Sequence, residues 1–139
     1  MPLKKLTTYV TIASVALLAG CGGGGGDNTP KGAASSYFKA LESGDYGAAC
    51  DKIAAASKQK LQAAAKGKSC ADALGVGLKS SQGSAALKTL KNATFGEPTL
   101  KGDRGTVPVT VKSIGTALPI PVVKEGGTWK VESSAAVGG

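Results

Sequence analysis

The apolar residues of this chain change their spacing once. Between residues 29 and 74 they recur every three or four positions, which predicts amphipathic helices. Beyond Ala93 they alternate with polar residues, which predicts strands that bury one face. Helices followed by an antiparallel meander predict the α+β class, with the N-terminal helices packed against one face of the sheet.

Four residues that favour the N-cap position divide the first part into four predicted helices. They are Thr29, Asp45, Ser57 and Ser69. Pro30 suits the first position of the first helix, whereas Gly44 and Gly67 are expected to end the first and third. Asp72 completes a capping box with Ser69. The apolar face expected on the second helix consists of Tyr46, Ala49, Cys50, Ile53 and Ala54.

The segment between the helices and the strands has no clear period. Residues 79–84 are polar and contain Gly and Ser, so they are predicted to form a loop. Residues 85–92 fit either one turn of helix or the approach to a strand, and we favour the short helix.

Four antiparallel strands are predicted in the second part of the chain. They cover residues 94–101, 106–114, 118–123 and 129–132, with turn pairs at 102–103 and 126–127. The residues expected on alternating core-facing positions are Val107, Val109, Val111, Leu118, Ile120, Val122, Trp129 and Val131. Pro108, Pro119 and Pro121 each remove a ladder donor, so their strands should be exposed at an edge, bulged or bent there.

The N-terminal segment has the pattern of an export signal. Lys4 and Lys5 precede an uncharged apolar run over residues 6–18, which would span about 20 Å as a helix and is too short to cross a bilayer. The following Leu18-Ala19-Gly20-Cys21 resembles the lipobox of bacterial lipoproteins. The resemblance implies a thioether-linked diacylglycerol on Cys21, cleavage before it, and acylation of the new amino group by a fatty acid such as palmitate. The alternative is an ordinary secretory signal in which Cys21 is incidental.

These features predict the domain organisation and the location. The signal peptide covers residues 1–20 and is removed, and residues 21–29 form the lipidated cysteine and a Gly-rich tether with a span of roughly 16 Å. One folded domain is expected over residues 30–133, followed by a flexible tail over 134–139. The expected location is the cell membrane, with the domain lipid-anchored on the extracytoplasmic side.

Cys50 and Cys70 are the two thiols that remain once Cys21 is lipidated. An even number of thiols outside the cytoplasm favours a disulfide, here between the second and the fourth helix. A metal site has little support, because the chain has no histidine and no further sulfur ligand. A reactive thiol would need an exposed electropositive environment, whereas Cys50 is expected on an apolar face.

A set of motifs in fixed order resembles the nuclear-transport-factor-2-like superfamily, and more narrowly its small lipoproteins. The motifs are Tyr37-Phe38-Lys39-Ala40-Leu41, Gly44-Asp45-Tyr46 with Ala49-Cys50, then Cys70, Gly102-Asp103 and Gly126-Gly127-Thr128-Trp129-Lys130-Val131. The resemblance covers residues 30–133. It implies a cystatin-like cone, in which a curved four-stranded antiparallel sheet wraps a long first helix and leaves a pocket inside.

Large side chains that could line such a pocket are few. They are Tyr37, Phe38, Leu41, Tyr46, Ile53, Phe95 and Trp129. A small apolar molecule or an acyl chain would suit this lining, and the same residues would equally serve as the filling of the core. A carrier of a small hydrophobic ligand or lipid is therefore one expected function.

The superfamily also includes isomerases and dehydratases that depend on acidic residues, Tyr or His. The chain has no histidine, and most of its acids are expected in caps and turns, so we predict that the domain is not an enzyme and needs no cofactor or metal. The favoured function is a non-enzymatic binding or scaffolding domain of the cell envelope, with a small apolar ligand or an envelope protein as partner.

The charge distribution adds a second candidate surface. Without Lys4 and Lys5 the 17 basic residues become 15, against 9 acidic ones, and eight lysines between Lys52 and Lys91 face a single acid, Asp72. Such a basic half suits contact with anionic headgroups, or it is a solvated face that keeps the protein soluble. Nucleic acid is not an expected partner, because the lipobox places this surface outside the cytoplasm.

Overall fold

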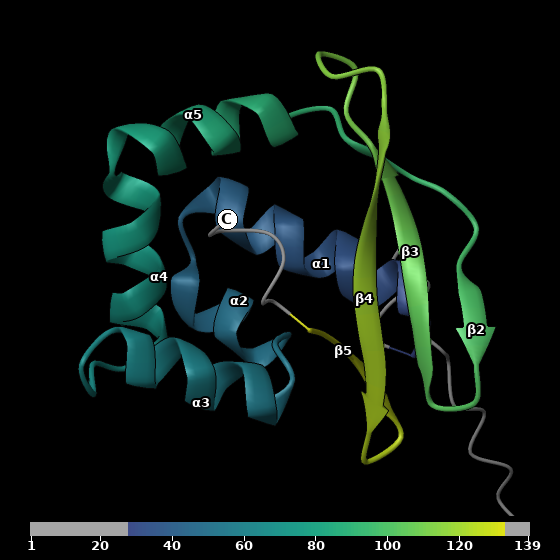
Figure 1. Ribbon diagram of the computed structural model, residues 1–139, viewed down its shortest axis with the longest axis horizontal. Helices are drawn as coiled ribbons and strands as arrows, with labels where there is room; N and C mark the ends of the chain where they lie inside the picture. The colour runs from purple at the N-terminus through teal and green to yellow at the C-terminus, as the bar shows by residue number, and fades with distance from the viewer. Residues whose placement is uncertain (1–27, 133–139) are drawn as a thin grey trace, which may run out of the picture.

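The computed structural model describes residues 28–132. The predicted signal peptide, Cys21, all but the end of the tether and the tail over 134–139 lie outside these residues. Figure 1 shows helices on one side and a curled sheet on the other, with α1 (Pro30–Ser43) running from the helical side across the back of the sheet. The predicted α+β class, with N-terminal helices packed against an antiparallel sheet, is confirmed.

Along residues 28–132, all the helices come before all the strands. After α1 come four more helices, α2 (Tyr46–Asp51), α3 (Ala55–Ala64), α4 (Cys70–Lys79) and α5 (Ser81–Leu90). The strands are β1 (Thr94–Phe95), β2 (Thr99–Lys101), β3 (Arg104–Thr110), β4 (Ala117–Glu125) and β5 (Thr128–Val131). Within residues 28–132, no helix combines the length and the apolar composition that crossing a bilayer requires.

Three of the four predicted N-caps are confirmed. The side-chain oxygen of Thr29 accepts a hydrogen bond from Gly32 N, and that of Asp45 accepts one from Ala48 N, each at 3.0 Å. Ser69 accepts one from Asp72 N at 3.2 Å, while its hydroxyl donates to the Asp72 carboxylate at 2.7 Å. These bonds satisfy N–H groups that have no partner within their own helix.

The boundary between the second and third helix differs from the prediction. The second helix ends at Asp51, and α3 begins at Ala55, so Ser57 is a buried residue inside the helix and not its cap. The N-terminal end of α3 is capped from a distance, because the backbone N–H of Ala55 donates to both carboxylate oxygens of Glu125 at 3.3 Å. The residues between the helices extend the sheet, with Ile53 in a parallel bridge to Val131.

The predicted loop over residues 79–84 is wrong. The fourth helix continues to Lys79, and Ser80 alone separates it from α5, accepting a hydrogen bond from Gly83 N at 3.1 Å and donating to Gly77 O at 2.7 Å. The corner is this tight because Gly83 has no side chain. A Cβ at this position would lie 2.2 Å from Gly77 O and 2.5 Å from the Cα of Leu78.

Two glycine-to-alanine substitutions at this corner should have opposite effects. Gly83→Ala is expected to lower the free energy of unfolding by about 1–3 kcal/mol, because the added methyl group collides with the backbone of α4. Gly77→Ala is expected to raise it by about 0.5–1 kcal/mol, because a Cβ there meets no atom of residues 28–132 within 4 Å and alanine favours the helix. Urea unfolding measures both changes in the free energy of unfolding, and two changes of the same sign would contradict this geometry.

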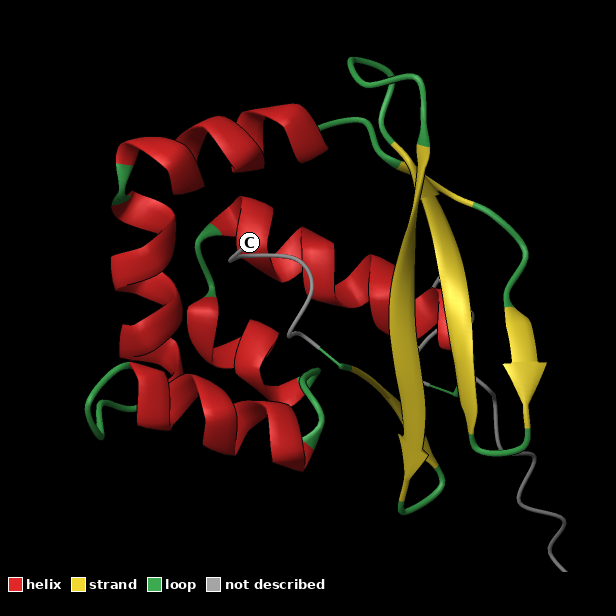
Figure 2. Cartoon of the chain, in the orientation of Figure 1, coloured by secondary structure: helices red, strands yellow, loops and turns green. Residues whose placement is uncertain are grey.

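The sheet is four strands wide and antiparallel, and it curls into an open half-barrel (Figure 2). Its order is β1-β3-β4-β5, with β2 pairing the other half of β3. The first and second strands therefore form a single edge strand that is interrupted at residues 96–98, in the place of the predicted strand 94–101. The curvature agrees with the cone expected from the sequence.

The strand prolines lie where strand pairing is interrupted or ends. Pro108 is paired with Pro119 across β3 and β4, and its carbonyl accepts a hydrogen bond from Gly96 N at 2.8 Å. Because the N–H and C=O of a strand residue point to the same side, the missing donor of Pro108 faces the interruption of the edge strand. Pro119 and Pro121 face the other side of β4. Pro119 lies beyond the residues of β4 that pair with β5, whereas the carbonyl of Pro121 accepts a hydrogen bond from Glu132 N at 2.9 Å, where that pairing ends. The predicted edge position is confirmed at Pro119, and Pro121 lies where the pairing of β4 with β5 ends.

The core lies between the helices and the face of the sheet that they cover. The largest fully buried side chains are Tyr37, Ile53, Leu74, Val107, Val109, Val111, Val122 and Val131. Leu118 was expected in this set but is 38% exposed, and the predicted second strand ends at Thr110, short of Ile114. Figure 1 shows the reason: this end of the β3–β4 hairpin projects beyond the helices.

Candidate functional site

The aromatic and aliphatic residues predicted to line a pocket pack against one another. Tyr37, Phe38, Leu41, Ile53 and Trp129 are buried in the hydrophobic core, and Tyr46 and Phe95 pack against it while half-buried. The ring of Phe38 lies edge-on to that of Tyr37 at 5.4 Å between centroids, and 5.6 Å from that of Phe95. These contacts use the large side chains to join α1 to the sheet.

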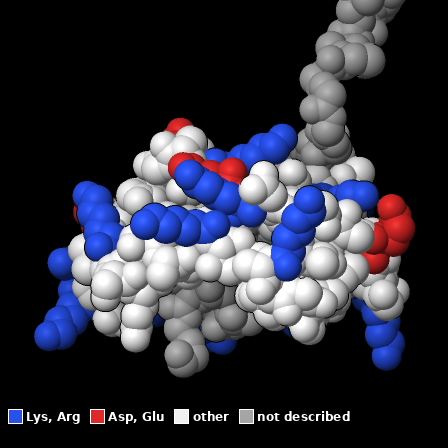
Figure 3. All heavy atoms as spheres, turned by 90° about the horizontal axis from the view of Figure 1, so that it is seen from above, with Lys and Arg blue, Asp and Glu red and all other residues white. Residues whose placement is uncertain are grey.

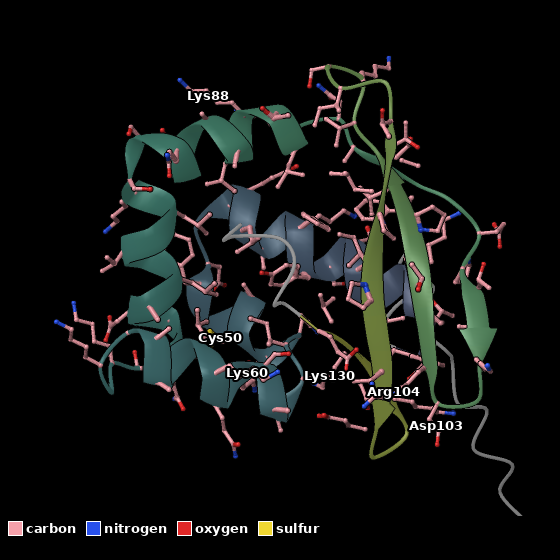
Figure 4. All side chains as sticks on the ribbon, in the orientation of Figure 1. Cys50, Lys60, Lys88, Asp103, Arg104 and Lys130 are labelled. Atoms are coloured by element: carbon pink, nitrogen blue, oxygen red, sulfur yellow. A yellow bond between two sulfur atoms is a disulfide. The ribbon has the colours of Figure 1, made fainter. Side chains whose placement is uncertain are left out.

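The predicted disulfide is present. Cys50 of α2 is bonded to Cys70 of α4 with an S–S distance of 2.05 Å, and both residues are buried. Figure 4 shows Cys50 inside the helical half, where α2 approaches α4. The bond uses both sulfurs, so neither is a free thiol or a metal ligand. Residues 28–132 hold no other cluster of His, Cys, Asp or Glu side chains that suits a metal ion.

A surface hollow between α3 and α4 is the clearest candidate site, and we call it the α3–α4 groove. Its volume is about 370 Å³. The residues that line it are Leu61, Ala64, Ala65, Lys66, Lys68, Ala73, Val76 and Gly77. Val76 is 60% exposed, which makes it the most exposed of the large apolar side chains between residues 28 and 132. The groove is therefore an apolar depression with lysines at one end.

The end of α3 places those lysines. Lys66 has a left-handed backbone conformation with φ of 56°, followed by Gly67 with φ of 80°, and Gly67 N donates to Gln62 O at 2.9 Å. This arrangement ends the helix and turns the chain back toward α4. A left-handed conformation is uncommon for a residue with a Cβ, and glycine or asparagine usually occupies it.

A second hollow lies on the other side of Val76 and Lys68. It has a volume of about 400 Å³ and is lined by Tyr46, Lys68, Ala71, Asp72, Gly75, Val76 and Lys79. Tyr46, one of the predicted pocket residues, thus borders this second hollow. The Asp72 carboxylate gives this second hollow a negative group that the α3–α4 groove lacks.

The α3–α4 groove was not found from the sequence. Its lining carries no large aromatic residue, and its signals are small: the pair Ala64-Ala65 at the end of one helix, and Gly77 inside another. The two segments become one site only because α3 and α4 pack together. The connection between them over residues 65–69 is short, and the disulfide between α2 and α4 closes the loop that contains α3.

Basic side chains are spread widely over the visible face in Figure 3. They extend from end to end of this face, which is seen from above, and predominate over acidic ones. Ion pairs join Lys31 to Glu97 and Arg104 to Glu132, at 3.5 Å each, away from the groove. Lys66, Lys68 and Lys79 thus have no acidic partner among residues 28–132.

The resemblances to lipoproteins and to the nuclear-transport-factor-2-like superfamily stay predictions from the sequence. Compared with family models, with curated proteins and with solved structures, the chain has no match.

Proposed function

We propose that this protein is a lipid-anchored lipoprotein of the cell envelope whose folded domain is a non-enzymatic binding or scaffolding module. The single observation that carries the binding role is the α3–α4 groove, an apolar depression on the outside of a domain whose large side chains fill its core. Exposed apolar surface beside a depression is typical of a contact site for a ligand or partner.

The anchor in this proposal depends on the lipobox that ends at Cys21. Residues 22–29 would hold the domain within a short distance of the bilayer, so the module would act at the membrane surface. The long first helix crossing a curled antiparallel sheet supports a cone of the nuclear-transport-factor-2-like kind as its scaffold.

Cell fractionation of a Cys21→Ser variant tests the anchor. The unchanged protein is expected in the membrane fraction, to resist extraction by high salt and to be released by detergent, because an acylated chain is held by apolar contacts that salt does not weaken. The variant cannot receive the lipid, so salt is expected to release the domain. The uncleaved signal segment is a second possible anchor in this variant. Replacing residues 1–21 by a secretory signal with its own cleavage site controls for that segment. A domain that stays in the membrane fraction without Cys21 would contradict the proposal.

A further inference from the structure

In the α3–α4 groove, apolar side chains are left in contact with water. Val76 is 60% exposed, and Leu61 beside it is half-buried. Covering such surface is favourable in proportion to the apolar area removed from water. A ligand with an apolar chain would therefore gain free energy by lying between α3 and α4.

Gly77 keeps the groove open. A glycine inside a helix is less favourable than alanine, so its presence calls for a reason. Gly75 has one, because a Cβ there would lie 3.3 Å from the ring of Tyr46. Among residues 28–132, a Cβ at Gly77 would meet nothing within 4 Å, so no contact in this part of the chain requires the glycine. What its missing side chain provides is space in the groove.

Lys66 and Lys68 give the groove a charged end. The left-handed backbone of Lys66 is unfavourable for a lysine, so this position keeps an ammonium group where glycine or asparagine would be expected. Both lysines are exposed, neither has an acidic partner among residues 28–132, and no acid lines the groove. Two unpaired cations beside apolar surface complement an anion attached to an apolar chain.

From these observations we propose that the α3–α4 groove binds a free fatty acid, with its acyl chain over Val76 and Leu61 and its carboxylate at Lys66 and Lys68. This inference rests on the proposed function, because it names the ligand class of the same module. A volume of about 370 Å³ is near the lower end for ligand sites, which suits one chain with a compact head and not a two-chain phospholipid. The neighbouring hollow is the poorer site for the carboxylate, because Asp72 would repel it.

Photolabelling of the full-length protein tests the inference. The protein is held in a nanodisc of phosphatidylcholine, which has no net charge, and exposed to dodecanoate that carries a diazirine. After irradiation and digestion, the labelled peptides are identified by mass spectrometry. Labelling is expected to concentrate on residues 61–68 and 73–77. Unlabelled dodecanoate should displace the probe about tenfold more effectively than dodecanol, which has the same chain but no charge.

Two double variants with the same change in net charge separate the groove from general attraction. Lys66→Asn with Lys68→Gln should weaken the labelling about tenfold, and the fold should persist because asparagine accepts the left-handed conformation. Lys60→Gln with Lys88→Gln should leave the labelling unchanged, since neither lysine lines the groove, and Figure 4 shows Lys88 projecting from α5 at the opposite end of the helical half from Lys60. Gly77→Leu should abolish the labelling by filling the groove.

Three results would overturn the inference. Equal loss in the two double variants would mean that the lysines attract anions without a site. Equal displacement by dodecanol would remove the role of the carboxylate, and labelling of the core around Tyr37 would place the ligand inside the cone. None of these results bears on the proposed lipid anchor at Cys21. That proposal is contradicted separately if a domain lacking Cys21 stays in the membrane fraction.

Discussion

Replacing Cys50 and Cys70 together by alanine is expected to lower the free energy of unfolding by about 3 kcal/mol. The two residues are 20 positions apart, and their bond ties α2 to α4 across the connection that contains α3. Without it the unfolded chain gains the freedom of an open loop, and a small domain has few other contacts to compensate. The α3–α4 groove should loosen as well, because one of its walls depends on this bond.

Urea unfolding measures this loss, with the fluorescence of Trp129 as the probe, since it is the single tryptophan and is buried. The unchanged protein unfolded in the presence of a strong thiol reductant is the matched control and should lose a similar amount. A double variant within about 1 kcal/mol of the oxidised protein would show that the bond adds little to the fold.

The substitution Phe38→Ala should cost about 3–5 kcal/mol, the range found for phenylalanine removed from a core. Phe38 is 3% exposed and its ring contacts those of Tyr37 on its own helix and Phe95 of β1. Its removal would leave a cavity where α1 meets the edge of the sheet. A domain with few large side chains has little else that can move in to fill it.

The same unfolding experiment on Ile114→Ala provides the control for Phe38→Ala. Ile114 is 50% exposed in the connection between β3 and β4, so its truncation should change the free energy of unfolding by no more than about 0.5 kcal/mol. Similar losses for the two substitutions would contradict the position of Phe38 as a central contact of the core.

Local signals were sufficient for most of the helical half. Thr29, Asp45 and Ser69 act as caps through hydrogen bonds to residues three positions further on, and such bonds depend on sequence neighbours alone. Alternation gave the inward face of β3 for the same reason, since successive side chains of a strand point to opposite sides. The α+β arrangement follows from these two periods.

The parts that were predicted wrongly depend on distant residues. The start of α3 at Ala55 is set by the carboxylate of Glu125, 70 positions away. The Ser and Gly residues over 79–84 are typical of a loop, yet Gly83 is there because α5 packs directly against the backbone of α4. Leu118 fits the alternation but lies where the hairpin extends past the helices.

The disulfide could be predicted from the sequence, whereas the α3–α4 groove could not. Cys50 and Cys70 could be paired from the sequence because few thiols remain to choose from. The groove depends on space left by small residues, Ala64, Ala65 and Gly77, and empty space has no signal in a pattern of large apolar side chains. Only the packing of α3 on α4 brings these residues together with Lys66 and Lys68.

The intact mass of the full-length protein, extracted from membranes without reductant, tests the lipid-anchored, disulfide-linked module most directly. We expect a chain that begins at Cys21 and carries the mass of a diacylglycerol with or without one further acyl group. Its mass should be two hydrogens lower than that of the same lipidated chain with Cys50 and Cys70 reduced. An unmodified chain that begins at Met1, or one cut elsewhere without added lipid, would contradict the anchor. A lipidated chain with both hydrogens present would contradict the bond between Cys50 and Cys70.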